Sequence, residues 1–226
     1  MAGTGTTARA VLKATTKTPI VTAADDPVQD GLVKSLAHPG GNVTGVSDAS
    51  PDLVAKRLQL LKEAAPRIVR VAGLRCPAGG RPDAQWRDAE TAARALGLTL
   101  VSVVVASSDQ VKGALDAVKR TRSDALLAFD CRYLNYPGAV MTSVPGMYYN
   151  RDQVEAGALM SYGRDAAEVF RVLAVYVDKI LRGTKPADLP VQQPTKFTLI
   201  INLKTAKALG LTLPQSILIR ADEVIQ

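Results

Sequence analysis

Short apolar runs alternate with segments of helical periodicity along most of the chain. The most regular block spans residues 68–129. There we expect strands at 68–74, 98–105 and 124–129, separated by helices at 83–96 and 109–121. The expected strands are continuously apolar, which is typical of strands covered on both faces. This βαβαβ order predicts a parallel sheet with right-handed crossovers.

The flanking regions continue the α/β alternation. Before the block we expect strands at 19–23 and 43–46 and helices at 28–37 and 51–64. After it come an irregular stretch at 130–149, which has two Pro-Gly pairs, and a further series of elements. That series is a strand at 158–160, a helix at 164–182, a strand at 197–201, a helix at 203–209 and a last strand at 217–219.

Length and composition restrict the class of protein. The 226 residues suit one large domain or two small lobes. With 47% hydrophobic and 22% charged residues, the chain is neither disordered nor a disulfide-rich mini-protein, and no apolar run is long enough for a membrane span. Aromatic residues make up only 4%, so the core must be mainly aliphatic, which favours parallel strands covered by helices.

The net charge of +7 raises the question of a nucleic-acid partner. Its basic residues are scattered, and no aromatic residues alternate with them as on a base-stacking surface. We therefore interpret the charge as a solvated surface, without nucleic acid as a partner. The N-terminus lacks the basic and apolar segments of a secretory signal, so the sequence as given predicts a protein that stays in the cytoplasm.

One glycine-rich motif lies at the start of the chain, at Gly3-Thr4-Gly5-Thr6-Thr7-Ala8. Together with Asp25 after the first strand, it has the outline of a dinucleotide fingerprint, which gives a nucleotide-binding, Rossmann-like enzyme as one interpretation. The other interpretation is an ordinary helix cap with loop glycines. In either case, free N–H groups and hydroxyls at a helix N-terminus attract an anion.

The two cysteines, Cys76 and Cys131, each follow the end of an expected strand. If those strands are neighbours, both thiols lie at one edge of the sheet, and we hypothesise that they approach within disulfide reach. Two unrelated thiols are the alternative. The only histidine, His38, lies in an expected surface turn, so neither a His-dependent nucleophile nor a structural zinc or other metal site is expected.

Polar and aromatic residues cluster near the end of the block. Asp130 follows the third strand of the block, at the edge where open α/β sheets bind ligands. It is suited to pair with a ligand ammonium, or to cap the next turn. Four tyrosines in the irregular segment are candidates for an apolar ligand wall or for ordinary packing: Tyr133, Tyr136, Tyr148 and Tyr149.

Ordered motifs over nearly the whole chain resemble one family, the ABC-transporter substrate-binding proteins of the tryptophan/tyrosine-uptake type. They begin with Asp26-Pro27-Val28, Pro39-Gly40-Gly41-Asn42-Val43-Thr44-Gly45 and Lys56-Arg57-Leu58. They continue with residues 155–163, 176–181, 185–191, 194–197, 201–206 and 221–225.

The resemblance implies a type I periplasmic-binding-protein fold, α/β, with two doubly wound parallel-sheet lobes that close over a small ligand. Residues 1–50 would be the first lobe and 51–157 the second, while 158–226 would hold a crossover, a long helix returning to the first lobe, and C-terminal strand-helix elements. It further implies an amino-acid ligand, with aromatic ones among the candidates, a membrane permease as partner, a periplasmic or other extracytoplasmic location, no cofactor and no catalytic residues.

The resemblance also implies a set of ligand-binding residues. Thr4 to Thr7, including Gly5 and Thr6, would receive the ligand carboxylate, Asp130 the amine, and Tyr162 would lie near the crossover. The candidate ligand-binding set is completed by Asp25 and Thr44.

The chain departs from the family pattern in two places. It starts at the Gly-Thr loop, so we expect an incomplete first lobe, exposed strand edges at 19–23 and 43–46, and dimerisation through such an edge. Residues 133–138 also replace a usual helix, because Pro137 would break one. The ligand-sensing domain of a transcription regulator shares this fold and is a third interpretation.

Overall fold

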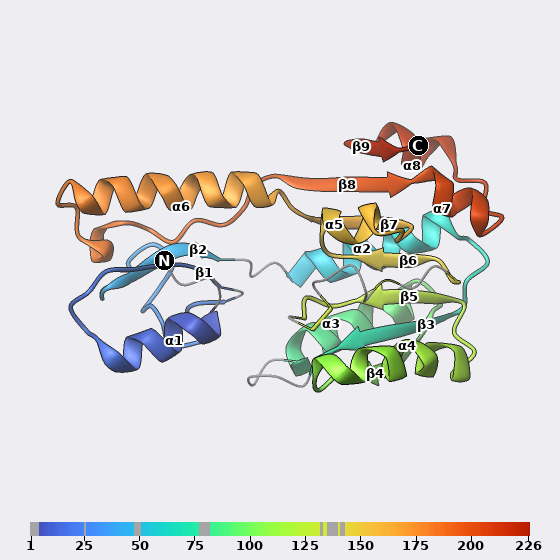
Figure 1. The fold of residues 1–226 in the computed structure, drawn as a ribbon, viewed down its shortest axis with the longest axis horizontal. Coiled ribbons are helices and arrows are strands. Elements are labelled where there is room, and N and C mark those ends of the chain that lie inside the picture. Colours follow the sequence, from blue (N-terminus) through green and yellow to red (C-terminus); the bar gives the residue numbers. More distant parts are fainter. Residues whose placement is uncertain are drawn as a thin grey trace. The chain divides into compact units, whose positions relative to one another are not determined.

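The computed structural model describes residues 5–24, 26–47, 51–76, 82–131, 133–134, 140 and 143–226. The chain divides into two compact units (Figure 1). Unit 1 consists of residues 1–50 and 164–197, and unit 2 of residues 51–163 and 198–226. The chain therefore passes from one unit to the other three times.

Unit 1 is built on a small parallel sheet of two strands, β1 (Ile20–Ala24) and β2 (Val43–Ser47). Helix α1 (Gly5–Ala14) contacts β1, and helix α6 (Ala166–Leu181) contacts both strands (Figure 1). Side chains alternate between the helices, because Ile20 and Ala24 pack in the cluster that includes α1, whereas Val21 packs with α6. Both expected strands of this region are thus present and paired with each other.

The exposed edge expected at 43–46 is corrected, because β2 is buried and a later segment of the chain covers it on the side away from β1. Beyond β2, Val46 forms a parallel bridge with Gln192, shortly after the 3₁₀ turn η3 (Pro186–Asp188). Gly45 takes a φ of +144°, and a Cβ there would lie 1.8 Å from the carbonyl oxygen of Thr22. Only glycine permits this approach of β2 to β1.

Unit 2 contains a seven-stranded sheet in the order β4-β3-β5-β6-β7-β8-β9. The strands are β3 (Arg70–Arg75), β4 (Thr99–Val104), β5 (Ala125–Ala128), β6 (Gly146–Tyr148), β7 (Met160–Arg164), β8 (Phe197–Asn202) and β9 (Glu223–Ile225). The pairs from β4 to β7 are parallel, as is β8 with β9. Asn202 N donates to Leu159 O and Asp165 N to Lys196 O, the opposed numbering of an antiparallel β7–β8 pair.

Helices cover both faces of this sheet. They are α2 (Pro51–Ala64), α3 (Pro82–Ala95), α4 (Val111–Arg120) with its leading 3₁₀ turn η1 (Ser108–Gln110), α5 (Arg151–Glu155), α7 (Leu203–Ala208) and α8 (Gln215–Ile219). Buried residues of α2 and α3 pack in one core cluster, and those of α4 and α5 in another. The expected α/β class with a mostly parallel sheet is confirmed.

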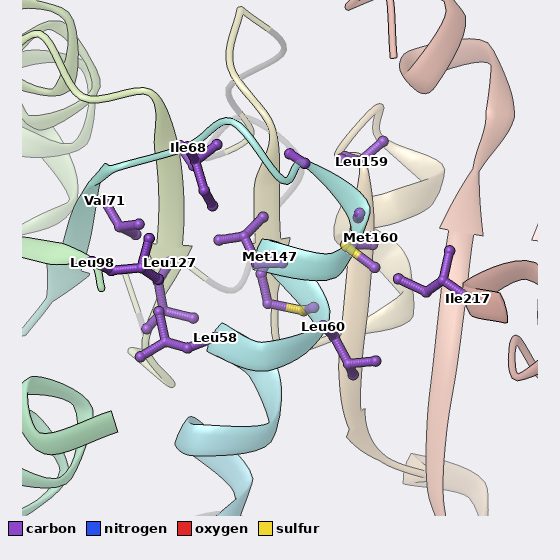
Figure 2. Close-up of a cluster of buried hydrophobic side chains, with 14 of the residues drawn as sticks. Leu58, Leu60, Ile68, Val71, Leu98, Leu127, Met147, Leu159, Met160 and Ile217 are labelled. Atoms are coloured by element: carbon purple, nitrogen blue, oxygen red, sulfur yellow. The ribbon is translucent and has the colours of Figure 1, made fainter. Parts of the chain in front are cut away.

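The central strand β5 explains why the apolar runs are continuous. Ala125 and Leu127 point to the cluster of α2 and α3, while Leu126 and Ala128 point to the cluster of α4 and α5. Figure 2 shows the first cluster, where Leu127 lies among side chains from α2 and from strands β3, β6 and β7. Each such fully buried aliphatic side chain contributes about 1.5–3 kcal/mol relative to exposure.

The helix expected at 28–37 is wrong. Gly31 takes a φ of +66°, and the N–H groups of Leu32 and Val33 both donate to Pro27 O, at 2.9 and 3.1 Å. The Asp26 carboxylate accepts from the backbone N–H groups of Val28 and Gln29. These local bonds replace a helical ladder, so the segment folds as a series of turns.

Two further expectations are corrected near the chain's irregular parts. The last strand is not at 217–219, which belongs to helix α8, where Ile217 is fully buried; the strand is β9. Three apolar residues in a row do not distinguish a strand from a helical turn. The stretch 130–149, expected to be irregular, also contains β6, whose Met147 and Tyr148 are fully buried.

Among the residues that the structure describes, no helix is long and apolar enough to cross a membrane.

Asp124 links the starts of β3 and β5, and it predicts a pH dependence of stability. Its Oδ2 accepts from Arg70 N and Val69 N, each at 2.8 Å, and these bonds hold the pKa of the carboxyl below its usual value. The contribution to stability is therefore complete above the unfolded-state pKa of about 3.9, and it is lost as the pH falls through the lower folded-state pKa.

We expect Asp124→Ala to lower the free energy of unfolding at pH 7 by about 1 kcal/mol. We also expect the free energy of unfolding of this variant to decrease less steeply as the pH is lowered. Urea titrations at a series of pH values measure both effects. Asp116→Ala, an exposed position on α4, is the matched control and should leave the acid-side slope unchanged. An unchanged slope in Asp124→Ala would contradict this role.

Candidate functional site

Parallel α/β sheets bind ligands beyond the carboxyl ends of their strands. In unit 1 that edge follows Ala24 of β1 and Ser47 of β2. In unit 2 it follows Arg75 of β3, Ala128 of β5 and Tyr148 of β6. Each of these edges is a candidate ligand-binding position within its own unit.

In unit 1, helix α1 begins at Gly5, close to the end of β1. A Cβ on Gly5 would lie 2.9 Å from Asp30 Oδ2 and 3.3 Å from Ala24 Cβ, so glycine lets the helix N-terminus approach the strand end. Asp30 accepts from Arg9 Nη2 at 2.7 Å. A carboxylate near the start of a helix is favoured by the helix dipole.

The other residues of unit 1 that were predicted to bind the ligand differ in where they lie. Thr4, Asp25 and the side chain of Thr6 lie outside the described residues. Thr7 lies on α1 and is exposed. Thr44 is fully buried, and its hydroxyl donates to Leu189 O at 2.7 Å, so this hydroxyl supports the fold of unit 1.

At the edge of unit 2, a disulfide joins Cys76 and Cys131, with Cα atoms 5.6 Å apart. Cys76 follows β3 and Cys131 lies just beyond β5, and these strands are direct neighbours in the sheet. The bond therefore fixes two loops at the strand ends to each other. Asp130, the candidate partner of a ligand amine, is the residue before Cys131 and is half-buried.

An aromatic pair that the sequence did not predict packs in the other core cluster, that of α2 and α3. The ring centroids of Trp86 and Phe129 are 5.8 Å apart, and the Arg75 guanidinium lies 5.1 Å from the Trp86 centroid. Gly73 leaves room for the pair, because a Cβ there would lie 2.6 Å from the Trp86 ring. Arg75 and Phe129 directly precede Cys76 and Asp130 in sequence, but no pattern in the sequence marks their contact with Trp86.

The three tyrosines of this segment that the structure describes differ in burial. Tyr148 is fully buried in the cluster of α4 and α5, and Tyr149 is also buried. Tyr133 is half-buried against the same cluster as Tyr148, and Tyr136 lies outside the described residues. For Tyr148 and Tyr149 the interpretation as a ligand wall is corrected to packing, because their side chains fill the core.

Tyr162 of β7 lies next to a buried arginine of α2. Arg57 Nε donates to the Tyr162 carbonyl at 2.6 Å, and the Arg57 guanidinium carbon lies 4.1 Å from the centroid of the Tyr149 ring. Burial raises the pKa of the Tyr162 phenol, and the charge of Asp222 raises it further, while Arg57 acts in the opposite direction. Tyr162 therefore stays neutral at physiological pH.

His38 is exposed in a turn, where its N–H donates to Ser35 Oγ at 3.0 Å. In the described part of the chain, no group of three or more His, Cys, Asp or Glu residues is arranged to hold a metal ion.

The sequence matches the profile of one protein family over residues 1–225, and that family is described as ABC transporter substrate binding protein. A curated relative, the tyrosine-binding protein of Clostridioides difficile strain R20291, is 27% identical over 217 residues. That match covers 90% of this chain and 60% of the relative, so the chain spans less than two thirds of the relative's length.

Two solved structures are similar over almost the whole chain. A conserved domain protein from Vibrio cholerae is 32% identical with a TM-score of 0.88, and the match covers 98% of this chain and 76% of that one. The ABC domain from Streptococcus pneumoniae in complex with L-Trp is 29% identical with a TM-score of 0.89, covering 99% and 77%. The fold is therefore that of the type I periplasmic binding proteins.

The disulfide predicts a large effect of reduction on unit 2. The bond closes a loop with a sequence separation of 55, for which restriction of the unfolded chain gives about 4 kcal/mol of stability. We expect the double variant Cys76→Ser/Cys131→Ser to lose about 2–5 kcal/mol. Urea unfolding followed by fluorescence measures this, because Trp86 is the single tryptophan and lies in unit 2.

The same titration with and without reductant supplies the control. Reductant should lower the unfolding midpoint of the unaltered protein and leave the double variant unchanged. Two free thiols in denatured, unreduced protein would contradict the bond.

Proposed function

The chain belongs to the family of ABC transporter substrate-binding proteins, and on that premise we propose that it binds a small amino-acid-like solute and delivers it to a membrane permease. The observation that carries this proposal is the family match over residues 1–225 together with two α/β units linked by three chain passages. Units 1 and 2 act as the two lobes.

An aromatic amino acid is the proposed ligand. Two relatives support this choice: one is named for tyrosine binding, and another was solved with L-Trp. In unit 1 the start of α1 at Gly5 and Thr7 receives the ligand carboxylate, as helix N-termini favour anions. In unit 2 Asp130 pairs with the ligand ammonium, near the aromatic pair of Trp86 and Phe129.

Binding works by hinge closure in this proposal. A solute that contacts both lobes binds their closed arrangement more tightly and shifts the population toward it. The role is one of binding without catalysis. The alternative of a nucleotide-binding enzyme at the Gly3-Thr4-Gly5 loop is not favoured by the family match.

The proposed place of action is outside the cytoplasm. The Cys76–Cys131 disulfide supports it, because such bonds form and persist in oxidising compartments. A permease in the membrane is then the partner that receives the solute.

The test of this function is a thermal melt with the twenty free amino acids and with NAD as a control. A ligand at about 100 times its Kd adds roughly 2.7 kcal/mol of stability, so L-tyrosine or L-tryptophan should raise the Tm and NAD should not. Asp130→Asn should reduce the rise, because the ammonium loses its charged partner. Asp116→Asn, an exposed position on α4, should not.

A Tm that no amino acid raises would contradict the proposed function. A rise with NAD alone would favour the nucleotide-binding alternative instead.

We also propose a homodimer that forms through β1. In the described residues, β1 pairs with β2 on one side and with no strand on the other. An open strand edge offers backbone N–H and C=O groups to a second strand. Sedimentation velocity at increasing concentration should show a monomer–dimer equilibrium, and a monomer at every concentration would contradict it.

A further inference from the structure

Arg57 is the single charged residue among the buried residues that the structure describes, at 4% exposure. It lies in α2, the helix that begins at Pro51, immediately after the chain first passes from unit 1 to unit 2. Burying a guanidinium is costly, and apolar residues often serve stability as well as buried charges do. The burial of Arg57 therefore points to a role in holding the local backbone in position.

Arg57 contacts the segment in which the chain passes between the units for the second time. Its Nε donates to the carbonyl of Tyr162, and unit 2 ends one residue later, at Gly163. A Cβ on Gly163 would lie 2.2 Å from the Tyr149 carbonyl oxygen and 3.8 Å from Arg57 Nη2. The strand thus leaves unit 2 through a space that only glycine fits.

The third passage meets the same point. Thr198, the first residue of unit 2 after the chain returns, lies on β8, and its hydroxyl is 3.5 Å from the carbonyl oxygen of Gly163. Within unit 2, the strand that leaves the unit and the strand that returns to it therefore lie next to each other at Gly163. Arg57, on the helix that follows the first passage, lies beside them.

Tyr149, on which the guanidinium is stacked, is itself fixed. Its N–H and that of Asn150 both donate to Gln153 Oε1, at 3.3 and 3.0 Å. Gln153 is buried and donates to Leu134 O at 2.7 Å. These bonds hold the backbone at Tyr149, and its buried ring supports the guanidinium of Arg57.

We propose that Arg57 is a positioning residue that holds the crossover strand β7 where it leaves unit 2, and thereby limits the range of arrangements that the two units sample. Its effect on ligand affinity rests on the proposed function above. A planar guanidinium stacks on a ring and donates from Nε at the same time, which the ammonium of lysine does not do.

The test measures the distance between the units without any ligand. Spin labels are attached at Leu181→Cys on α6 of unit 1 and Ile219→Cys on α8 of unit 2, positions that are 82% and 74% exposed. Pulsed electron resonance then gives the distribution of label distances. The native cysteines are joined in the disulfide and do not take a label.

Arg57→Met should broaden this distribution relative to the unaltered protein, and Arg57→Lys should broaden it less. The matched control is Lys62→Met on the same helix, which removes a 2.7 Å bond to Ile68 O that lies within unit 2 and away from the passages. It should leave the width unchanged. If Arg57→Met does not fold, the width of the distance distribution in Arg57→Lys decides whether the proposal holds.

A lowered Tm with an unchanged distribution in a folded Arg57 variant overturns the proposal, because a merely structural role predicts that result. Titration with L-tyrosine adds a second readout. We expect Arg57→Met to weaken binding roughly tenfold, because the ligand must then order the crossover as it binds. If the unaltered protein binds no amino acid, the proposed function fails, while the distance widths still decide the role of Arg57.

Discussion

Apolar burial on both faces of the unit 2 sheet is the constraint from which the other features follow. Along β5, Leu127 faces the helical layer of α2 and α3 (Figure 2), and Leu126 faces that of α4 and α5. Both side chains are fully buried. When both faces of a strand are buried, polar and reactive side chains are restricted to the ends of the strand. Asp130 and the disulfide accordingly lie beyond the carboxyl ends of β3 and β5, at the edge where this fold class binds ligands.

The same constraint explains how much of the fold was predictable. Continuous apolar runs predict β3, β4 and β5, and the alternation with helices predicts their parallel order. Of the three, β4 is the edge strand and is only partly buried, so its apolar run overstates its burial. The errors lie where local bonds or short length override periodicity. At residues 28–37 the Asp26 carboxylate and the left-handed Gly31 replace a helix with turns, and β6 has only three residues between irregular segments.

The candidate site was predictable only where chain order implies proximity. Cys76 and Asp130 follow neighbouring strands, so the topology alone brings them to one edge. The contact between Arg57 and Tyr162 spans 105 residues and joins a helix to a strand, and no local pattern marks it. The sequence likewise does not distinguish Tyr148 and Tyr149 from tyrosines that face a ligand, although both are buried in the core.

The α/β fold, the polar groups at the strand ends of unit 2 and membership of the substrate-binding family together support the proposed role in solute binding. Isothermal titration calorimetry of the oxidised, folded chain with L-tyrosine and L-tryptophan tests that claim most directly. We predict saturable heat with one molecule bound per chain for at least one of the two amino acids. Titrations without saturable heat for either amino acid would contradict it.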